Sequence, residues 1–176
     1  MSGTWELPFG KGKSFLNSAH GPMQILAGGW QVNGVVTLQG GFPLGIGTAS
    51  NQTNSFGGGS RPNNNGVSAN LPDGERTLDR WFNTSVFSQP APFTFGNTAR
   101  TLPDVRTPGL TNVDFSITRN TRITERINTQ FRAEFFNPFN HANFGSPGVA
   151  LGNANFGVIS SALDPRIIQL GLKILF

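Results

Sequence analysis

Five segments of the chain alternate apolar and polar residues with a period of two, the pattern that predicts β-strands. The clearest of them ends the sequence, where Gln169, Gly171 and Lys173 stand between apolar residues. The predicted strands cover residues 3–9, 29–42, 113–123, 127–136 and 167–176. Because successive side chains of a strand point to opposite sides, each strand is expected to have one apolar and one polar face.

Two long segments without clear periodicity separate these strands, residues 43–112 and residues 141–166. Such segments are unusual in compact soluble domains, whereas outer-membrane barrels commonly have long extracellular loops and short periplasmic turns. If the last strand ends in the periplasm, both long loops lie outside the cell. The predicted fold is therefore all-β, with antiparallel up-and-down transmembrane strands and long extracellular loops.

The short connection between the third and fourth predicted strands constrains how they pair. Apolar residues face apolar ones only if both positions are odd or both are even. A three-residue turn at 124–126, closed by Ile123 and Ile127, satisfies this rule and places Phe115 beside Phe135. The same register pairs Ile117 with Ala133, Ser116 with Glu134 and Thr118 with Arg132.

The composition favours strands and loops over helices. Gly and Pro account for 23 and 12 of the 176 residues, and 12% of the residues are charged. Phe is abundant, with 16 residues, and Tyr is absent, so Phe must take the place of Tyr at a membrane interface. No run of 18 apolar residues occurs, which excludes a transmembrane helix but not transmembrane strands.

The residue counts and the distribution of charge argue against disulfides, metal sites and nucleic-acid binding. Cys is absent, which excludes disulfides and thiolate metal sites, and His20 and His141 are too scattered for a metal cluster. The net charge of +4 comes mostly from Arg residues spread along the chain, whereas nucleic-acid binding needs a denser basic patch. The acidic residues within 73–79 could bind Ca²⁺, but a salt-bridged loop is the simpler interpretation. We expect no metal, no cofactor, no nucleic-acid partner and no enzymatic activity.

The first residues, 1–6, lack the features of a signal peptide. An exported barrel protein needs such a peptide. We therefore expect that Met1 is not the true start and that the chain is a fragment of a longer protein.

The end of the chain carries the most specific signal. Apolar residues occupy every second position up to a final Phe: Ile168, Leu170, Leu172, Ile174 and Phe176. This pattern resembles the recognition signal of the barrel-assembly machinery, which requires an apolar stripe facing lipid and an edge that pairs with the assembly factor. The alternative is an ordinary amphipathic terminal strand of a soluble β-protein.

Several motifs, taken in order, resemble a known family. They are Gly29-Trp30-Gln31-Val32-Asn33-Gly34, Gly41-Phe42-Pro43, Arg61-Pro62-Asn63, Trp81-Phe82-Asn83-Thr84, Phe95-Gly96-Asn97, Asn112-Val113-Asp114 and the segment from Phe131 to Gly145. They resemble TonB-dependent receptors, most closely the Oar-like receptors with an N-terminal carboxypeptidase-regulatory-like domain. The resemblance spans nearly all of this chain but only the last part of such a receptor.

The resemblance implies a receptor of the cell outer membrane that takes up a large solute, such as a glycan, a peptide or a metal chelate. Its implied partners are outer-membrane lipid, the barrel-assembly machinery, the remaining strands and plug of the receptor, and TonB, which acts through the missing N-terminal part. Such barrels have about 22 strands around a plugged lumen. About five strands cannot close a barrel and leave two open edges.

Two groups of side chains are candidates for contact with a solute or with the lumen. Five aromatic residues of the long loop either stack on sugars or anchor the loop: Trp81, Phe82, Phe87, Phe93 and Phe95. Five polar residues are predicted to face the lumen and to hydrogen-bond within the wall: Asp114, Asn120, Gln130, Arg132 and Glu134. Arg119 falls on the lipid-facing side, where it can snorkel to the periplasmic interface; at mid-bilayer it would cost about 2–4 kcal/mol.

Two other functions remain open at this level. A soluble β-sandwich that binds carbohydrate through the aromatic loop would dissolve in water and have a closed core between two sheets. A structural outer-membrane protein built from several copies would form a stable oligomer.

Overall fold

The computed structural model describes residues 1–10, 12–18, 27–56 and 59–176, which divide into two compact units. The sheet unit consists of Met1–Leu38, Thr111–Ala142 and Asp164–Phe176, and the loop unit of Gln39–Leu110 and Asn143–Leu163. No helix in the described ranges is long and apolar enough to cross a membrane.

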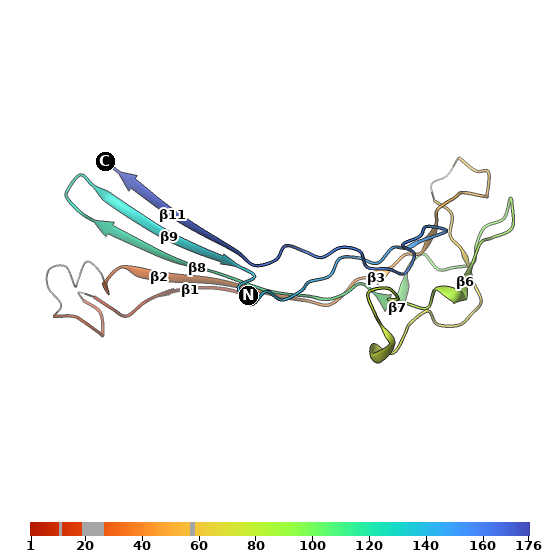
Figure 1. Cartoon of the computed structure of the whole chain (residues 1–176), viewed down its shortest axis with the longest axis horizontal. Coiled ribbons are helices and arrows are strands. Elements are labelled where there is room, and N and C mark those ends of the chain that lie inside the picture. The colour runs from red at the N-terminus through yellow and green to blue at the C-terminus, as the bar shows by residue number, and fades with distance from the viewer. Residues whose placement is uncertain (11, 19–26, 57–58) are drawn as a thin grey trace. The chain divides into compact units, whose positions relative to one another are not determined.

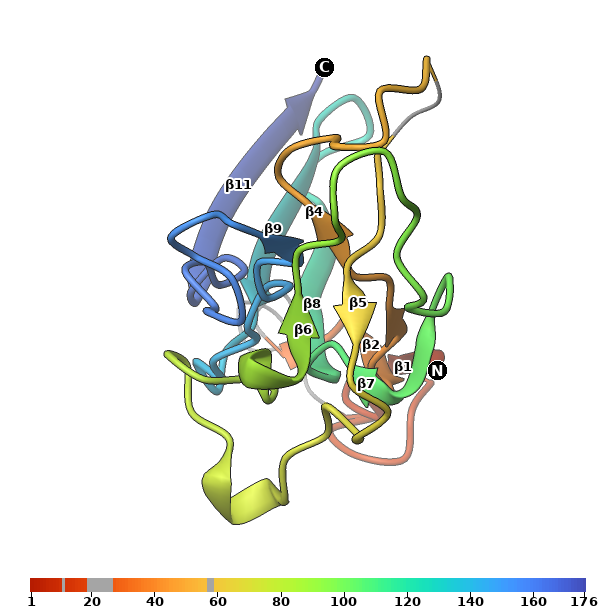
Figure 2. The ribbon, with the colours of Figure 1, turned by 90° about the vertical axis from the view of Figure 1, so that its right-hand side faces the viewer.

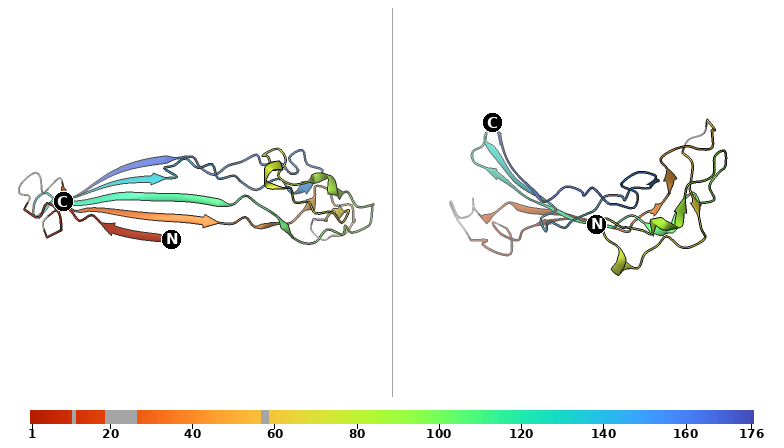
Figure 3. Two further views of the ribbon diagram at one scale, coloured as in Figure 1. Left: turned by 90° about the horizontal axis from the view of Figure 1, so that it is seen from below. Right: turned by 45° about the vertical axis from the view of Figure 1, so that its right-hand side comes forward.

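The sheet unit contains five strands in the spatial order β1-β2-β8-β9-β11 (Figures 1 and 3). They are β1 (Ser2–Glu6), β2 (Trp30–Gln39), β8 (Leu110–Arg122), β9 (Asn128–Phe136) and β11 (Ile167–Leu175). β1 runs antiparallel to β2, and β9 runs antiparallel to both β8 and β11. Gly29 lies against the carbonyl of Asn120 and Gly34 against that of Asp114, so β2 and β8 also run in opposite directions. The all-β, antiparallel fold is confirmed.

The predicted register between β8 and β9 is also confirmed. Phe115 lies opposite Phe135 and Ile117 opposite Ala133, and the amide of Ile123 donates to the carbonyl of Ile127 at 2.9 Å. The hydroxyl of Thr124 accepts hydrogen bonds from the two amides that follow Glu125, at 3.3 and 3.0 Å. This local bonding holds the turn at three residues, which keeps apolar residues opposite apolar residues.

Three strand boundaries differ from the prediction by three residues. The third strand, expected to begin at 113, begins at Leu110. The first strand, expected over 3–9, ends at Glu6, because Pro8 has no amide to donate and the chain turns at Gly10, whose φ is 111°. The second, expected over 29–42, ends at Gln39. There the amide of Phe42 donates to the hydroxyl of Thr107 instead of continuing the ladder with β8.

The loop unit is more ordered than its lack of periodicity indicated. Short strands pair within it as β3 with β7, β4 with β10 and β5 with β6 (Figure 2). Their bounds are β3 (Pro43–Leu44), β4 (Gly47–Thr48), β5 (Asn63–Asn64), β6 (Phe87–Ser88), β7 (Leu102–Arg106) and β10 (Ala150–Leu151), with 3-10 helices η1 (Asp73–Glu75) and η2 (Thr84–Val86). Strands of two to five residues are too short to show a period of two in the sequence.

A hydrophobic core holds the loop unit together. Phe82 is fully buried, and Phe87 and Ile46 are nearly so. The ring of Phe156 meets Phe82 at 5.3 Å and Phe87 at 5.9 Å between centroids, in both cases edge to face. Because Phe156 comes from the second long segment, the two segments between strands pack into one unit rather than forming separate loops.

The first prediction concerns this core. Phe82→Ala should lower the free energy of opening of the loop unit by about 3–5 kcal/mol, because it leaves a cavity where three rings meet. Hydrogen exchange of the β7 amides in the detergent-extracted protein measures this change. Phe93→Ala is the matched control, since Phe93 is 74% exposed, and should change it by less than about 0.5 kcal/mol. Equal effects of the two substitutions would contradict the proposed core.

Candidate membrane-facing site

One face of the five-stranded sheet is apolar. Directly opposed residues of antiparallel strands project to the same side. Phe131 of β9 lies opposite Leu172 of β11, and Phe135 lies opposite both Phe115 of β8 and Ile168 of β11. The rings of Phe115 and Phe135 stack with centroids 4.5 Å apart. The apolar positions of the terminal strand therefore continue a surface that begins on β8 and β9.

This apolar face is exposed in the chain as it stands. Leu170 and Leu172 are 72% and 68% exposed, and all nine residues of β11 are classed as exposed. Ala133 is the one buried apolar residue in the described part of the sheet unit. A β-sandwich would bury such a face against a second sheet, whereas a barrel wall turns it toward lipid.

The opposite face is polar, and the five predicted lumen-facing residues all lie on it. The amide of Gln130 donates to the side-chain oxygen of Asn120 at 2.9 Å, and Arg132 forms an ion pair of 2.9 Å with Glu134. These contacts run along and between strands, which agrees with hydrogen bonding within the wall. Asp114 differs from the other four, because it bonds at the end of the sheet.

Asp114 belongs to a hydrogen-bonded cluster around Asn137, where β9 ends. The Asp114 carboxylate accepts from the backbone amide of Asn137 at 3.0 Å and from the side chain of Asn112 at 2.9 Å. The side chain of Asn137 donates to the carbonyls of His141 and Asp164, at 2.9 and 3.3 Å, and accepts from the His141 amide at 2.9 Å. We name this cluster the Asn137 clamp. It ties β8 and the end of β9 to the segment that leads into β11.

The sequence interpretation missed the clamp. Asn137 precedes a proline and adopts a positive φ of 45°, which Asn tolerates better than most residues. The Asn-Pro pair directly after a strand is a turn signal that could have pointed to it. Its distant partners could not have been identified, because Asp114 and Asp164 lie 23 and 27 residues away in the chain.

The five candidate aromatic residues of the long loop differ in burial, three being packed in or against the core and two being exposed. Phe82 and Phe87 are core residues and half-buried Trp81 packs against that core, so these three anchor the loop. Phe93 and Phe95 are 74% and 77% exposed. Phe95 lines a cleft of about 400 Å³ together with Arg61, Gly96 and several hydroxyl-bearing residues. Only these last two aromatics are therefore available for contact with a solute.

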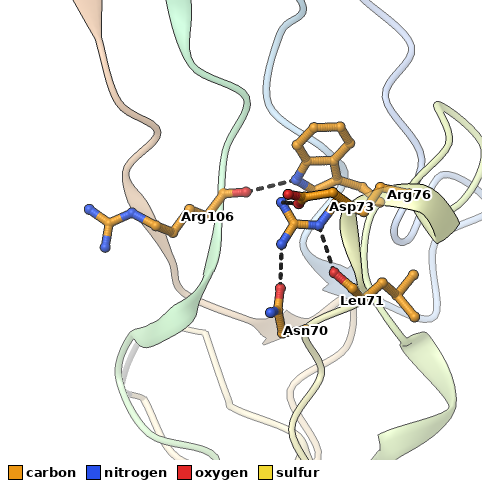
Figure 4. A network of polar contacts seen from close by, with 6 residues as sticks. Asn70, Leu71, Asp73, Arg76 and Arg106 are labelled. Carbon is orange, nitrogen blue, oxygen red and sulfur yellow. Dashed lines mark hydrogen bonds and ion pairs between the residues drawn. The ribbon is translucent and has the colours of Figure 1, made fainter.

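Asp73, one of the acidic residues of the loop, pairs with Arg76, which also makes other local contacts (Figure 4). Arg76 forms an ion pair with Asp73 at 3.4 Å and donates to the Asn70 side chain and the Leu71 carbonyl. Its guanidinium lies 5.7 Å from the ring centroid of Trp81, whose indole N–H donates to a backbone carbonyl of β7 at 2.7 Å. Within the described residues, no group of three or more His, Cys, Asp or Glu could hold a metal ion. His20 lies outside the described residues.

Comparison with known proteins identifies the family. Residues 1–169 match the family model described as the outer membrane beta barrel domain. The chain belongs to this family. No curated protein and no solved structure gave a match.

Membership of the outer membrane beta barrel family assigns the exposed apolar face to lipid and the chain to the outer membrane. The family and the unburied apolar sheet together do not support the soluble β-sandwich alternative. On this assignment Ile168, Leu170, Leu172 and Ile174 of the terminal strand share the face that is turned toward lipid.

The second prediction tests this face. Leu170→Arg places a charge against lipid, at a cost of about 2–4 kcal/mol near the bilayer midplane. The fraction of protein in the outer membrane that changes its gel mobility on boiling should fall. Gln169→Arg, on the opposite face beside Glu134, is the control and should assemble normally. Normal assembly of Leu170→Arg, or failure of both variants, would argue against the assignment of faces.

The third prediction concerns the Asn137 clamp. Asn137→Ala should destabilise the folded protein by about 1–3 kcal/mol, because it removes the three hydrogen bonds made by the buried Asn137 side chain. The urea midpoint of the detergent-solubilised protein measures this loss. His141→Ala retains the backbone groups that Asn137 uses, so it should leave the midpoint nearly unchanged. If the urea midpoint changed equally little in both variants, the clamp would not contribute to stability.

Proposed function

We propose that this chain is the C-terminal barrel segment of a TonB-dependent, Oar-like receptor that imports a large solute across the outer membrane. The observation that carries the proposal is the open sheet. In the described residues β1 and β11 each pair on one side only, so the wall is completed by further strands. An incomplete wall, together with receptor-like motifs distributed from Gly29 to Gly145, favours a segment of a large barrel.

The proposed topology places the loop unit outside the cell. β2 and β9 run in the same direction, so the segments that follow them leave the same end of the sheet, while the turn at 124–126 lies at the other end. The two longest connections, from β2 to β8 and from β9 to β11, therefore share one end, while the other end has the short turn and the 23-residue connection between β1 and β2. The placement of the longest connections at one end matches the extracellular side of outer-membrane barrels. A folded loop unit with its own core would present a defined surface to an arriving solute.

Within this proposal the two exposed aromatics have a binding role. The cleft beside Phe95 combines an aromatic ring, the guanidinium of Arg61 and the hydroxyls of Thr53 and Ser55. A ring that stacks on an apolar surface and polar groups that orient a ligand are the usual ingredients of a solute site. These groups suit a glycan or a peptide, and they form no nucleophile–base pair, so we propose binding and transport rather than catalysis.

The remaining partners also belong to the proposal. The apolar stripe of β11 would be recognised by the barrel-assembly machinery, and the polar face would contact a plug inside the completed barrel. TonB would act through a part of the receptor that this chain does not contain. An oligomeric structural protein is the second candidate, because the same open edges could pair with other copies of the chain.

The fourth prediction tests the proposal in the source bacterium. An antibody against residues 166–176 should detect, in the outer-membrane fraction, a band far above 18.9 kDa that shifts on boiling. Cross-linking in intact cells should capture TonB with the same band. A shifting oligomer that dissociates to about 18.9 kDa would support the structural protein instead. A large band that never captures TonB would contradict the transport mechanism.

A further inference from the structure

Arg119 is the charged residue on the apolar face of the described strands. It lies opposite Phe131, which in turn lies opposite Leu172. Its guanidinium carbon is 5.1 Å from the ring centroid of Trp30, and the Trp30 ring meets Phe131 edge to face at 6.2 Å. The other charged residues of these strands project to the polar face. A positive charge is therefore held among apolar side chains on the lipid side of the wall.

This charge has no carboxylate partner in the described part of the chain. The ion pairs found there join Lys13 to Glu6, Arg76 to Asp73 and Arg132 to Glu134. The acidic residues of β8 and β9 lie on the opposite face of the sheet. The connection between β1 and β2 cannot supply a carboxylate either, because residues 7–72 contain neither Asp nor Glu. No carboxylate of the described residues therefore neutralises Arg119.

Local structure orients the guanidinium. Its Nε donates to the carbonyl of Gly28 at 3.1 Å, and the ring of Trp30 lies beneath it. Gly29 makes this arrangement possible, because its φ is 79° and a Cβ there would lie 3.0 Å from the carbonyl oxygen of Asn120. The two terminal nitrogens of Arg119 have no hydrogen bond to a described residue. They form the planar fork that binds phosphate oxygens well.

Arg119 lies in the part of β8 that is nearer the turn at 124–126. It is nine residues from Leu110, where β8 begins, and three residues from Arg122, where β8 ends. Three residues span about 10 Å along a strand, so the long side chain can extend its guanidinium toward the interface at the turn end. One row nearer the turn, the same face carries Thr121 opposite Thr129. Trp30 beside Arg119 is the residue type that lines membrane interfaces.

We propose that Arg119, Trp30 and the carbonyl of Gly28 form a site for the phosphodiester group of a glycerophospholipid in the periplasmic leaflet. The guanidinium fork binds the phosphate oxygens, and Trp30, Phe131 and Leu172 contact the upper part of the acyl chains. The apolar surroundings favour a lipid over free phosphate, although both offer the same charge. The assignment to the periplasmic leaflet rests on the proposed topology, with the turn at 124–126 in the periplasm, and does not depend on transport through TonB.

The fifth prediction tests this site on the native protein, extracted from its outer membrane in mild detergent. Native mass spectrometry should show a retained phospholipid. After delipidation, titration with phosphatidylglycerol should restore it, and excess inorganic phosphate should not displace it. Arg119→Gln should weaken this binding roughly tenfold or more, the loss expected for a charge-assisted hydrogen bond. Lys173→Gln removes a charge from the opposite face and should bind like the unaltered protein.

The results that overturn the proposal are equally definite. Arg119→Gln that still shifts on boiling and binds phosphatidylglycerol as tightly as the unaltered protein would exclude the site. Displacement of the lipid by inorganic phosphate would identify a small-anion site instead. If Arg119→Gln fails to assemble, Arg119→Lys is the second variant, because it preserves the charge but not the planar guanidinium. Arg119→Lys should assemble and bind the phospholipid more weakly than the unaltered protein. Binding as tight as that of the unaltered protein would contradict the proposed geometry.

Discussion

The structure depends on one constraint, that backbone amides and carbonyls inside a bilayer must find partners within the protein. An unpaired group in hydrocarbon costs several kcal/mol. β9 and β11 meet this demand over nine consecutive residue pairs, and β8 and β9 over another nine. Because the amides and carbonyls are hydrogen-bonded between strands, every second side chain of a strand can face lipid. The outer edges of β1 and β11 are where the same demand requires further strands.

A paired backbone is not sufficient, because a slip of one residue would exchange the apolar and polar faces of the strand. Local and distant contacts both oppose such a slip. The three-residue turn sets β8 against β9, and the Asn137 clamp ties the entry of β11 to the strands beside it. In the loop unit, Phe156 packs between Phe82 and Phe87, so the two long segments support each other. Polar contacts thus align the sheet, while apolar contacts fold the loop unit.

The sequence predicted the sheet well because its signal is local. Alternation located the five strands. Parity, together with a three-residue turn closed by Ile123 and Ile127, was enough to pair Phe115 with Phe135. The loop unit could not be predicted in this way, because its core joins apolar residues that are far apart in the chain and follow no period. For the same reason the candidate aromatics could not be sorted in advance. Whether Phe82 is buried and Phe95 exposed depends on packing between segments, not on their neighbours in sequence.

The central claim is that β11 lies in the outer membrane with its even-numbered residues toward lipid. The chain contains no Cys, so single cysteines at positions 168 to 174 can each carry a spin label in the membrane-embedded protein. Access of oxygen, which concentrates in lipid, should alternate with a period of two, with maxima at 168, 170, 172 and 174. An oxygen profile without alternation, or free access of a water-soluble relaxant to the even positions, would contradict the account.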